Sequence, residues 1–554
     1  MVVGGGINGI AILRDLALQG IDVALVERGD FVSGASSASS HMIHGGIRYL
    51  ENGEFRLVQE SVAERNELLR TAPHYVRPLQ TTIPIHRTIS GVLSAPFRLL
   101  VTHGRGKPRE RGALLIKVGL MIYDTFSRDG GSVPRHRFRG RKASLAQQPA
   151  LNPEFRYTAT YFDASMHDPE RLALDVLFDG LRAGGDRARA ASYTAAVGLS
   201  KGGVRLRDET TGEEFDFSAP VVINATGSWA DLTNDALGDA TRFMGGTKGS
   251  HIVVDSPELL EATRGREMFF EHSDGRIVLI YPLKDRVLIG TTDIKADPRE
   301  RTVCTEEEVD YFIELAAQVF PSIPVRRDQI VYTFSGIRPL PNQDQLAPGF
   351  VSRDYRIEEA KRDGSTVLTV VGGKWTTFRA LAEHVTDRAL AALGSARKVS
   401  TSGRPIGGGA GFPRTERDRG NWILTRAGEH PAALVETMLE RYGTRAEEVL
   451  EVIPAGASPL VHAPGYFQAE LAHLAAEEQV VHLDDVLMRR TSLAFVGGLT
   501  TTALREVAEA VADSLGWDPD TVDAEVRRAA AILLEHHLID VTAKEAAQFV
   551  TERV

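Results

Sequence analysis

The first thirty residues constrain the fold more than any other part of the chain. Gly4, Gly6 and Gly9 form a G-x-G-x-x-G sequence, and the residues after it have the apolar spacing of a helix. The apolar run 21–26 then predicts a buried strand, which ends on the acid Glu27. Such a glycine loop lets the backbone approach a pyrophosphate at a helix N-terminus, and the acid can accept the hydroxyls of an adenosine ribose. The sequence therefore predicts a βαβ dinucleotide site.

The strand before this loop is expected to be short. Only Met1, Val2 and Val3 precede the first glycine, whereas strands usually have about five or six residues. We expect either a looser cofactor site than usual or a chain that starts late.

Length and composition narrow the class of protein. A chain of 554 residues with 43% apolar and 25% charged residues predicts a globular protein of several domains. Its net charge of −10 argues against a general nucleic-acid binder. With Cys304 as the single cysteine, neither an internal disulfide nor a cysteine-based metal site can form, and no metal is expected. Because no apolar run is long enough to span a bilayer, we expect a cytosolic protein or one lying on a membrane surface.

The segment 86–117 departs from this acidic composition. It carries seven Lys and Arg residues against one acid, Glu110, with apolar residues interleaved. It is either a surface loop with scattered charge or an interfacial segment whose apolar side chains enter a membrane of anionic lipid. On the second interpretation, the membrane contact falls within 92–111.

Two further strand–turn units are expected to lie against the dinucleotide. A buried strand at 220–224 leads into Ala225-Thr226-Gly227, and another at 368–371 leads into Gly372-Gly373-Lys374 and a helix. Between them, the run 247–293 has the pattern of antiparallel sheet. After a glycine-rich and serine-rich stretch, the chain is helical to its end.

Eight blocks in order from residue 4 to residue 379 carry a specific family resemblance. They are Gly4-Gly5-Gly6-Ile7-Asn8-Gly9, Ser36-Ser37-Ala38-Ser39-Ser40, Ile43-His44-Gly45-Gly46-Ile47-Arg48-Tyr49-Leu50-Glu51, Phe55-Arg56-Leu57-Val58, Lys248-Gly249-Ser250-His251-Ile252-Val253-Val254, Gly290-Thr291-Thr292-Asp293, Ser335-Gly336-Ile337-Arg338-Pro339-Leu340 and Gly372-Gly373-Lys374-Trp375-Thr376-Thr377-Phe378-Arg379. The tail continues the match with Asp484-Asp485-Val486-Leu487-Met488-Arg489-Arg490-Thr491. Together they resemble FAD-dependent glycerol-3-phosphate dehydrogenase of the aerobic, quinone-linked type.

The resemblance implies an α/β fold with three parts. A Rossmann-like FAD-binding domain, similar to glutathione reductase and D-amino-acid oxidase, is expected at 1–75, 150–230 and 335–395. An antiparallel-sheet substrate-binding domain is expected at 76–149 and 231–334. A linker at 396–413 would then lead to an all-α C-terminal domain at 414–554.

The same resemblance implies the residues around the substrate, namely Arg48, Tyr49, His251, Arg338 and Lys374. A phosphorylated substrate needs fixed cations, preferably arginine, although an ion pair with a neighbouring acid would also explain each of these cations. His251 is the favoured general base or proton relay because imidazole titrates near neutral pH. A core histidine held by hydrogen bonds is the alternative, and His44 and Arg338 are rival catalytic residues.

FAD is the expected cofactor. The residues implied to hold it are Gly4, Gly6, Asn8, Gly9, Glu27, Ser36, Ser37, His44, Gly45, Ala225, Thr226, Gly227, Gly373, Lys374 and Thr376. Amides of the turn at 372–374 could stabilise negative charge on the reduced flavin. His41 stands where the family more often has Lys or Arg, so a phosphate contact there would be weaker or pH-dependent.

The implied reaction is oxidation of sn-glycerol 3-phosphate to dihydroxyacetone phosphate by hydride transfer to flavin N5, with electrons passed to a membrane quinone. The alternatives are an oxidase that produces hydrogen peroxide, a dehydrogenase of another polyol phosphate such as erythritol phosphate, and a non-catalytic flavoprotein scaffold. The expected location is cytoplasmic, peripheral on the inner face of the cytoplasmic membrane. Nucleic acid is not an expected partner, and a homodimer is left open.

Overall fold

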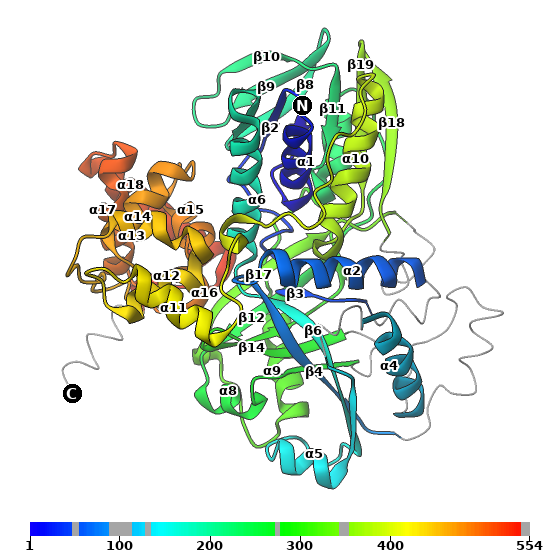
Figure 1. Ribbon diagram of the computed structural model, residues 1–554, viewed down its shortest axis with the longest axis vertical. Coiled ribbons are helices and arrows are strands. Elements are labelled where there is room, and N and C mark those ends of the chain that lie inside the picture. Colours follow the sequence, from blue (N-terminus) through cyan, green and yellow to red (C-terminus); the bar gives the residue numbers. More distant parts are fainter. Residues whose placement is uncertain (47–54, 88–112, 128–133, 272–276, 343–353, 544–554) are drawn as a thin grey trace, which may run out of the picture.

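Two large sheets and a bundle of helices make up the molecule (Figure 1). The computed structural model describes residues 1–46, 55–87, 113–127, 134–271, 277–342 and 354–543. The first sheet lies at the top of Figure 1, the second lies below it, and the C-terminal helices lie to one side. The predicted α/β fold with a helical C-terminal domain is confirmed.

The first sheet is built around the strand that precedes the glycine loop. Its order is β18-β19-β11-β1-β2-β7, parallel except for the antiparallel edge strand β18. Its strands are β1 (Val2–Val3), β2 (Val23–Val26), β7 (Ala188–Ala191), β11 (Val221–Asn224), β18 (Arg356–Arg362) and β19 (Ser365–Val371). β1 has two residues and is central, so both of its neighbours must be in place before it is covered.

Helices and a small meander cover the two faces of this sheet. α1 (Ile7–Leu18) packs against both α6 (Pro169–Gly184) and α10 (Phe378–Ala392), as Figure 1 shows. A separate antiparallel sheet packs its apolar side chains against the strands of the first sheet. It consists of β8 (Thr194–Ser200), β9 (Gly203–Asp208) and β10 (Glu214–Ser218). α7 (Ala230–Ala236) follows β11. This arrangement buries β1 and β2 from both sides.

Among the described residues the second sheet has ten strands. Eight follow the order β16-β12-β15-β14-β13-β4-β6-β3, and in addition β17 pairs with β12 and β5 with β6. Its strands are β3 (Met42–Ile43), β4 (Val76–Ile85), β5 (Arg137–Gly140), β6 (Tyr157–Met166), β12 (Thr247–Val254), β13 (Glu267–Glu271), β14 (Ile277–Leu283), β15 (Arg286–Gly290), β16 (Ile294–Lys295) and β17 (Ile330–Arg338). The helices connected to it are α2 (Phe55–Thr71), α4 (Ala113–Ser127), α5 (Arg141–Gln147), α8 (Pro257–Thr263) and α9 (Glu306–Val319).

The sheets divide the chain differently from the predicted domains. β3 and β6 belong to the second sheet, although they lie within the stretches 1–75 and 150–230 assigned to the cofactor domain. β17 also crosses the predicted boundary at residue 335. The chain passes between the two sheets several times, so contiguous ranges of sequence do not separate them.

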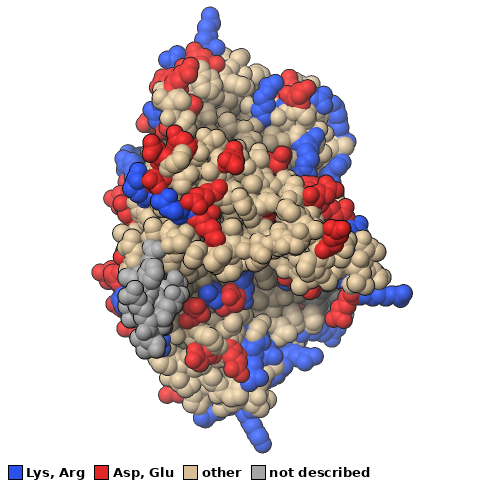
Figure 2. Space-filling model, turned by 90° about the vertical axis from the view of Figure 1, so that its left-hand side faces the viewer, with Lys and Arg blue, Asp and Glu red and all other residues tan. Residues whose placement is uncertain are grey.

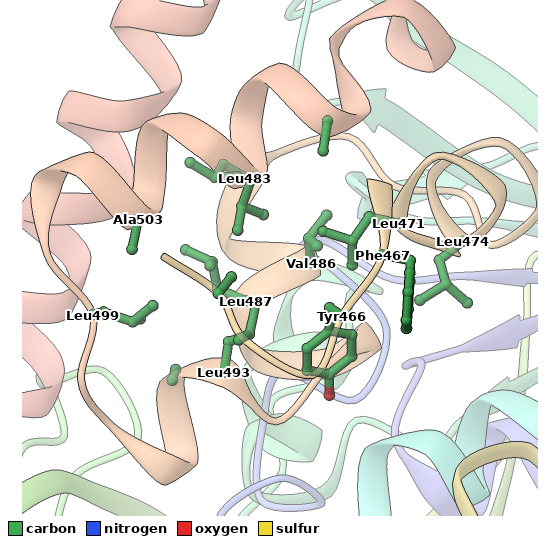
Figure 3. Close-up of a cluster of buried hydrophobic side chains, with 14 of the residues drawn as sticks. Tyr466, Phe467, Leu471, Leu474, Leu483, Val486, Leu487, Leu493, Leu499 and Ala503 are labelled. Atoms are coloured by element: carbon green, nitrogen blue, oxygen red, sulfur yellow. The ribbon is translucent and has the colours of Figure 1, made fainter. Parts of the chain in front are cut away.

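The C-terminal helices enclose their own apolar core and share it with the second sheet. They are α11 (Glu416–Arg426), α12 (Ala432–Tyr442), α13 (Ala446–Val452), α14 (Gln468–Glu477), α15 (Leu483–Asp485), a π-helix (Val486–Arg490), α16 (Leu493–Val496), α17 (Thr501–Leu515) and α18 (Pro519–His537). Leu471, Leu487 and Leu493 converge in this core (Figure 3). The same cluster of buried residues includes Tyr332 and Phe334 of β17, so the helices and the sheet pack as one body.

The stretch 396–413, predicted as a linker, is packed between the parts that it joins. A Cβ atom at Gly408 would lie 1.9 Å from the carbonyl oxygen of Tyr442, and one at Gly409 would lie 2.1 Å from that of Thr71. Its Arg397 forms a 2.9 Å ion pair with the buried Asp15 of α1. Gly408 and Gly409 therefore serve close backbone contact in this stretch.

Figure 2 shows acidic and basic side chains intermixed over the face that carries the C-terminal helices. In the part of the chain that the structure describes, we found no helix with the length and apolar character to cross a membrane.

Candidate active site

The glycine loop is closed so tightly that two of its positions admit only glycine. Gly4 has a φ of +108°, and a Cβ atom there would lie 2.8 Å from the carbonyl oxygen of Ala225. A Cβ atom at Gly9 would lie 1.9 Å from the carbonyl oxygen of Gly4. Larger residues would push α1 away from β1 and from the turn Ala225-Thr226-Gly227. The structure thus brings the predicted loop and that turn side by side.

The serine-rich loop at 33–40 covers the N-terminus of α1. The amide of Ile7, in the first turn of the helix, donates to Ser36 Oγ at 3.0 Å. Trp375 Nε1 donates to the carbonyl oxygen of Ser36 at 2.9 Å, and Ser37 Oγ donates to that of Gly34 at the same distance. A helix N-terminus attracts anions because its first amides are unpaired and its dipole is positive there. A phosphate at this point would meet both the helix amides and Ser36.

Glu27 lies at the end of β2, beside the glycine loop. Its carboxylate accepts from the amide of Gly5 at 2.7 Å and from that of Gly29 at 3.1 Å. Burial raises the pKa of Glu27, although these two hydrogen bonds lower it. The carboxylate is therefore fixed in one orientation at the edge where the carboxyl ends of parallel strands meet, where nucleotides bind in such sheets.

The second glycine turn faces Asn8 of α1. Gly373 has a φ of +103°, and a Cβ atom there would lie 2.7 Å from Asn8 Nδ2. Asn8 Oδ1 is buried and has no hydrogen-bond partner among the described residues. Since buried acceptors are normally paired, this oxygen suits a ligand that carries an N–H or O–H group. Lys374 Nζ donates to Ser61 Oγ at 2.6 Å, and Thr376 Oγ1 donates to the carbonyl oxygen of His44 at 3.3 Å.

His251 is buried on β12, between β15 and β17 of the second sheet. β12 pairs it with Gly290 of β15 and Phe334 of β17, and its ring stacks on that of Phe334 at 4.7 Å. Nε2 lies 2.9 Å from Ser40 Oγ, whereas Nδ1 has no partner among the described residues. Burial, reinforced by the charge of Arg338, holds the pKa of His251 well below its usual 6.5. The imidazole is therefore neutral at pH 7 and can accept a proton.

Arg338 is the last residue of β17, and its guanidinium lies over Gly249 of β12. Its guanidinium donates from Nη2 to Thr291 Oγ1 at 2.8 Å and to the carbonyl oxygen of Thr292 at 3.0 Å, and from Nη1 to Asp293 at 3.2 Å. A Cβ atom at Gly249 would lie 2.1 Å from Nη2, so only glycine leaves room for the guanidinium. Since residues two apart on a strand share a face, Arg338 lies over the same face of β12 that carries His251.

A buried carboxylate fixes the loop that holds Arg338. Glu308 of α9 accepts from Thr292 Oγ1 at 2.6 Å, from Ser250 Oγ at 2.8 Å and from Lys248 Nζ at 2.6 Å. Burial raises the pKa of Glu308, but the hydrogen bonds outweigh it and the pKa lies below the usual value. Glu308 could not be recognised as a site residue from sequence, because the Thr305 capping box explains an acid at that position of the helix without any reference to the site.

A second buried network positions the His44–Gly45 segment. The Gly45 amide donates to Asp163 Oδ1 at 2.9 Å, and the same oxygen accepts from Tyr123 at 2.6 Å and from Arg65 at 3.0 Å. The Arg65 and Asp163 side chains are almost completely buried. None of these three side chains was among the predicted site residues.

Two predicted positions lie outside the described residues and one lies elsewhere. Arg48 and Tyr49 fall in 47–54, which the structure does not describe. His41 is buried beside the rings of Phe334 and Phe495, and burial lowers its pKa to about 4. A neutral ring in this apolar setting does not support a phosphate contact by His41.

Comparison with known proteins gives a consistent assignment. Residues 1–388 match the family model "FAD dependent oxidoreductase", and residues 399–522 match "C-terminal domain of alpha-glycerophosphate oxidase". A glycerol-3-phosphate dehydrogenase of Synechocystis is 32% identical over 560 residues, covering 95% of each chain. The D-erythritol 1-phosphate dehydrogenase of Brucella abortus is 33% identical over 512 residues, covering 88% of this chain and 93% of that protein.

A solved structure extends the similarity to the fold. The glycerol-3-phosphate dehydrogenase of Bacillus halodurans, determined as a complex with FAD, superposes with a TM-score of 0.72. It is 22% identical in sequence, and the match covers 96% of this chain and 94% of that one.

Proposed function

Starting from the fact that this chain belongs to the FAD-dependent glycerol-3-phosphate dehydrogenase family, we propose that it oxidises sn-glycerol 3-phosphate to dihydroxyacetone phosphate and passes the electrons to a membrane quinone. The observation that carries the substrate assignment is that the guanidinium of Arg338, on β17, lies over the face of β12 that carries His251. A fixed guanidinium recognises a phosphate, and a neutral imidazole can take the proton of a neighbouring hydroxyl.

FAD is the cofactor, and the described residues fit it. The glycine loop and the α1 N-terminus would hold the pyrophosphate, and Glu27 would accept the adenosine ribose hydroxyls. The turn at Gly373, with the unpaired Asn8 Oδ1 opposite it, would receive the ring end. When bound, FAD supplies the acceptor for the hydride that leaves C2 of the substrate with two electrons.

His251 is the proposed base for the C2 hydroxyl proton. Its low pKa keeps it unprotonated at working pH, and its Ser40 contact fixes the ring plane. Arg338 would bind the phosphate, with Arg48, Tyr49 and Lys374 proposed beside it. His44 remains the rival base. A His251→Gln variant that keeps the wild-type rate of substrate oxidation would transfer the role to His44.

A second substrate has a specific observation in its favour. The Brucella relative, named for D-erythritol 1-phosphate, is as similar in sequence as the glycerol-3-phosphate dehydrogenases. Arg338 reads the phosphate and not the length of the polyol, so the described contacts serve either substrate. A comparison of kcat/KM for glycerol 3-phosphate and erythritol phosphates decides between them.

Membrane contact is proposed at one end of the second sheet. The predicted segment 92–111 lies outside the described residues, but α4 begins directly after it. α4 exposes Leu114, Val118 and Met121 at helical spacing, with fractional exposures of 49%, 47% and 55%. The exposed Lys117 lies between them in sequence and would face anionic headgroups. This surface would place the protein on the inner face of the cytoplasmic membrane, near its quinone.

One assay tests the proposal. The purified holoenzyme is mixed with glycerol 3-phosphate and FAD bleaching is followed, and the reduced protein is then exposed to oxygen or to a quinone analogue. Bleaching followed by fast reoxidation with the quinone supports the proposal. Absence of bleaching refutes the substrate, and rapid peroxide formation would make the protein an oxidase.

The membrane proposal needs its own test. Deletion of 92–111, or Val118→Glu with Met121→Glu, should release the protein from anionic liposomes, whereas Leu424→Glu on the exposed surface of α11 should not. Liposome binding that survives both changes would refute the assignment.

A further inference from the structure

Two consecutive arginines of the C-terminal domain contact the same aspartate of the cofactor domain. Arg489 Nε and Arg490 Nη1 both donate to Asp30 Oδ2. Arg490 and Asp30 have no exposed side-chain surface, and the Arg489 side chain is 8% exposed. Asp30 Oδ1 has no partner among the described residues, so the whole contact rests on one carboxylate oxygen. These arginines belong to the C-terminal block that resembled the family, and the proposed reaction gives them no role.

The backbone of the C-terminal domain is shaped to make this contact. Neighbouring side chains of a regular α-helix project about 100° apart, so two consecutive arginines rarely reach one atom. Here Val486–Arg490 forms a π-helix, whose wider turn is often found at functional sites. Arg489 is also held by Asp484 at 3.1 Å and by Asp485 at 2.6 Å, and Arg490 donates to the carbonyl oxygen of Glu478 at 2.7 Å.

Asp30 belongs to the turn that carries Glu27. The amide of Val32 in this turn donates to the carbonyl oxygen of Gly5 at 2.9 Å, and the Gly5 amide donates to Glu27. Tyr193 supplies a second tie, because its amide donates to the carbonyl oxygen of Gly29 at 2.8 Å and its hydroxyl donates to Asp485 at 2.7 Å. The turn 27–33 is thus fastened to the glycine loop on one side and to the C-terminal domain on the other.

We propose that Arg489 and Arg490 are positioning residues for the cofactor, which fix Asp30 and thereby hold Glu27 against the adenosine ribose. The C-terminal domain then forms part of the dinucleotide site without touching the dinucleotide. Because desolvation offsets most of the attraction within a buried ion pair, added stability alone does not explain why these charges are buried together. This inference rests on the proposed placement of the ribose at Glu27.

The test is FAD affinity, measured by quenching of flavin fluorescence as FAD is added to the apoprotein. Arg489→Gln should raise the Kd about tenfold, and Asp30→Asn should do the same with a smaller change in volume. Arg445→Gln is the matched control, because it removes an interdomain ion pair (2.7 Å, to Asp175) remote in sequence from the turn. It should change the Kd less than twofold, although it costs a comparable interdomain contact.

A double variant separates positioning from general destabilisation. If Arg489 acts through Glu27, then adding Arg489→Gln to Glu27→Gln should weaken FAD binding little beyond Glu27→Gln alone. If the increase in Kd of the double variant equals the product of the two single increases, the proposal is overturned. An unchanged Kd in folded Arg489→Gln would overturn it as well. If Arg489→Gln does not fold, Asp30→Asn carries the same comparison. An unchanged Kd for FAD in Glu27→Gln would overturn the placement of the ribose at Glu27. A negative result for Arg489→Gln alone would leave that placement intact.

Discussion

Removal of the Arg338 guanidinium should weaken the protein's hold on the substrate phosphate far more than it slows the oxidation. Two charge-assisted hydrogen bonds contribute about 1.5–3 kcal/mol each. Since the Arg338 side chain is 21% exposed, solvent screening reduces the combined contribution of these two hydrogen bonds to roughly 3 kcal/mol. At about 1.4 kcal/mol per factor of ten, Arg338→Ala should lower kcat/KM by roughly 150-fold. The phosphate is bound alike before and during the reaction, so this loss should fall on KM.

The assay for Arg338→Ala is steady-state oxidation with a dye acceptor, run in parallel on glycerol 3-phosphate and on glycerol. Glycerol lacks the phosphate, so its slow oxidation should be almost unaffected by the change. Arg327→Ala, which removes an exposed arginine paired with Glu306 and Asp310, is the control and should leave both substrates unchanged. An unaltered KM for glycerol 3-phosphate, or an equal loss on glycerol, would refute a phosphate-binding role.

Three other predictions concern the cofactor cradle, acid stability and a buried ion pair. Gly373→Ala should weaken FAD binding at least tenfold in a fluorescence titration, because the new methyl group would meet Asn8, whereas Gly394→Ala in open space should not. Burial lowers the pKa of His41 from 6.5 in the unfolded chain to about 4 in the folded protein, so the unfolded chain takes up a proton first as the pH falls. The free energy of unfolding should therefore be highest above pH 6.5 and should fall by up to about 3 kcal/mol as the pH drops toward 4. Urea unfolding at several pH values should show this loss, and it should be smaller in His41→Asn. Asp163→Asn should destabilise by about 3–5 kcal/mol, because it leaves a buried arginine unpaired, and a melting temperature equal to that of wild type would contradict this.

The glycine loop, its helix and the strand ending on Glu27 could be predicted from sequence because each follows a local rule. All three signals lie within the first thirty residues: the spacing of the glycines, the 3.6-residue apolar period and the position of the acid. The strand predicted at 368–371 likewise falls within β19 at Ser365–Val371. Local signals of this kind depend on nothing far away in the chain.

The parts that escaped prediction depend on partners distant in sequence. Glu308 meets Ser250 only after α9 folds onto β12, and Asp163 meets Arg65 and Gly45 only when β6 joins the second sheet. Neither acid carries a sequence signal that names its partner. The stretch 396–413 was predicted as a linker because of its glycines. Glycine is common both in flexible linkers and at close backbone contacts, and the sequence alone does not tell the two apart.

The central position of β1 has a consequence for the order in which this protein can be made. Its neighbour β11 ends at residue 224, and the sheet is complete only with β19, which ends at residue 371. At roughly 5–20 residues per second, the ribosome needs about 20–75 s to pass from the first strand to the last of these. Until β19 has been made the glycine loop lacks part of its sheet, so the polypeptide can capture its flavin only after about two thirds of its 554 residues have been added.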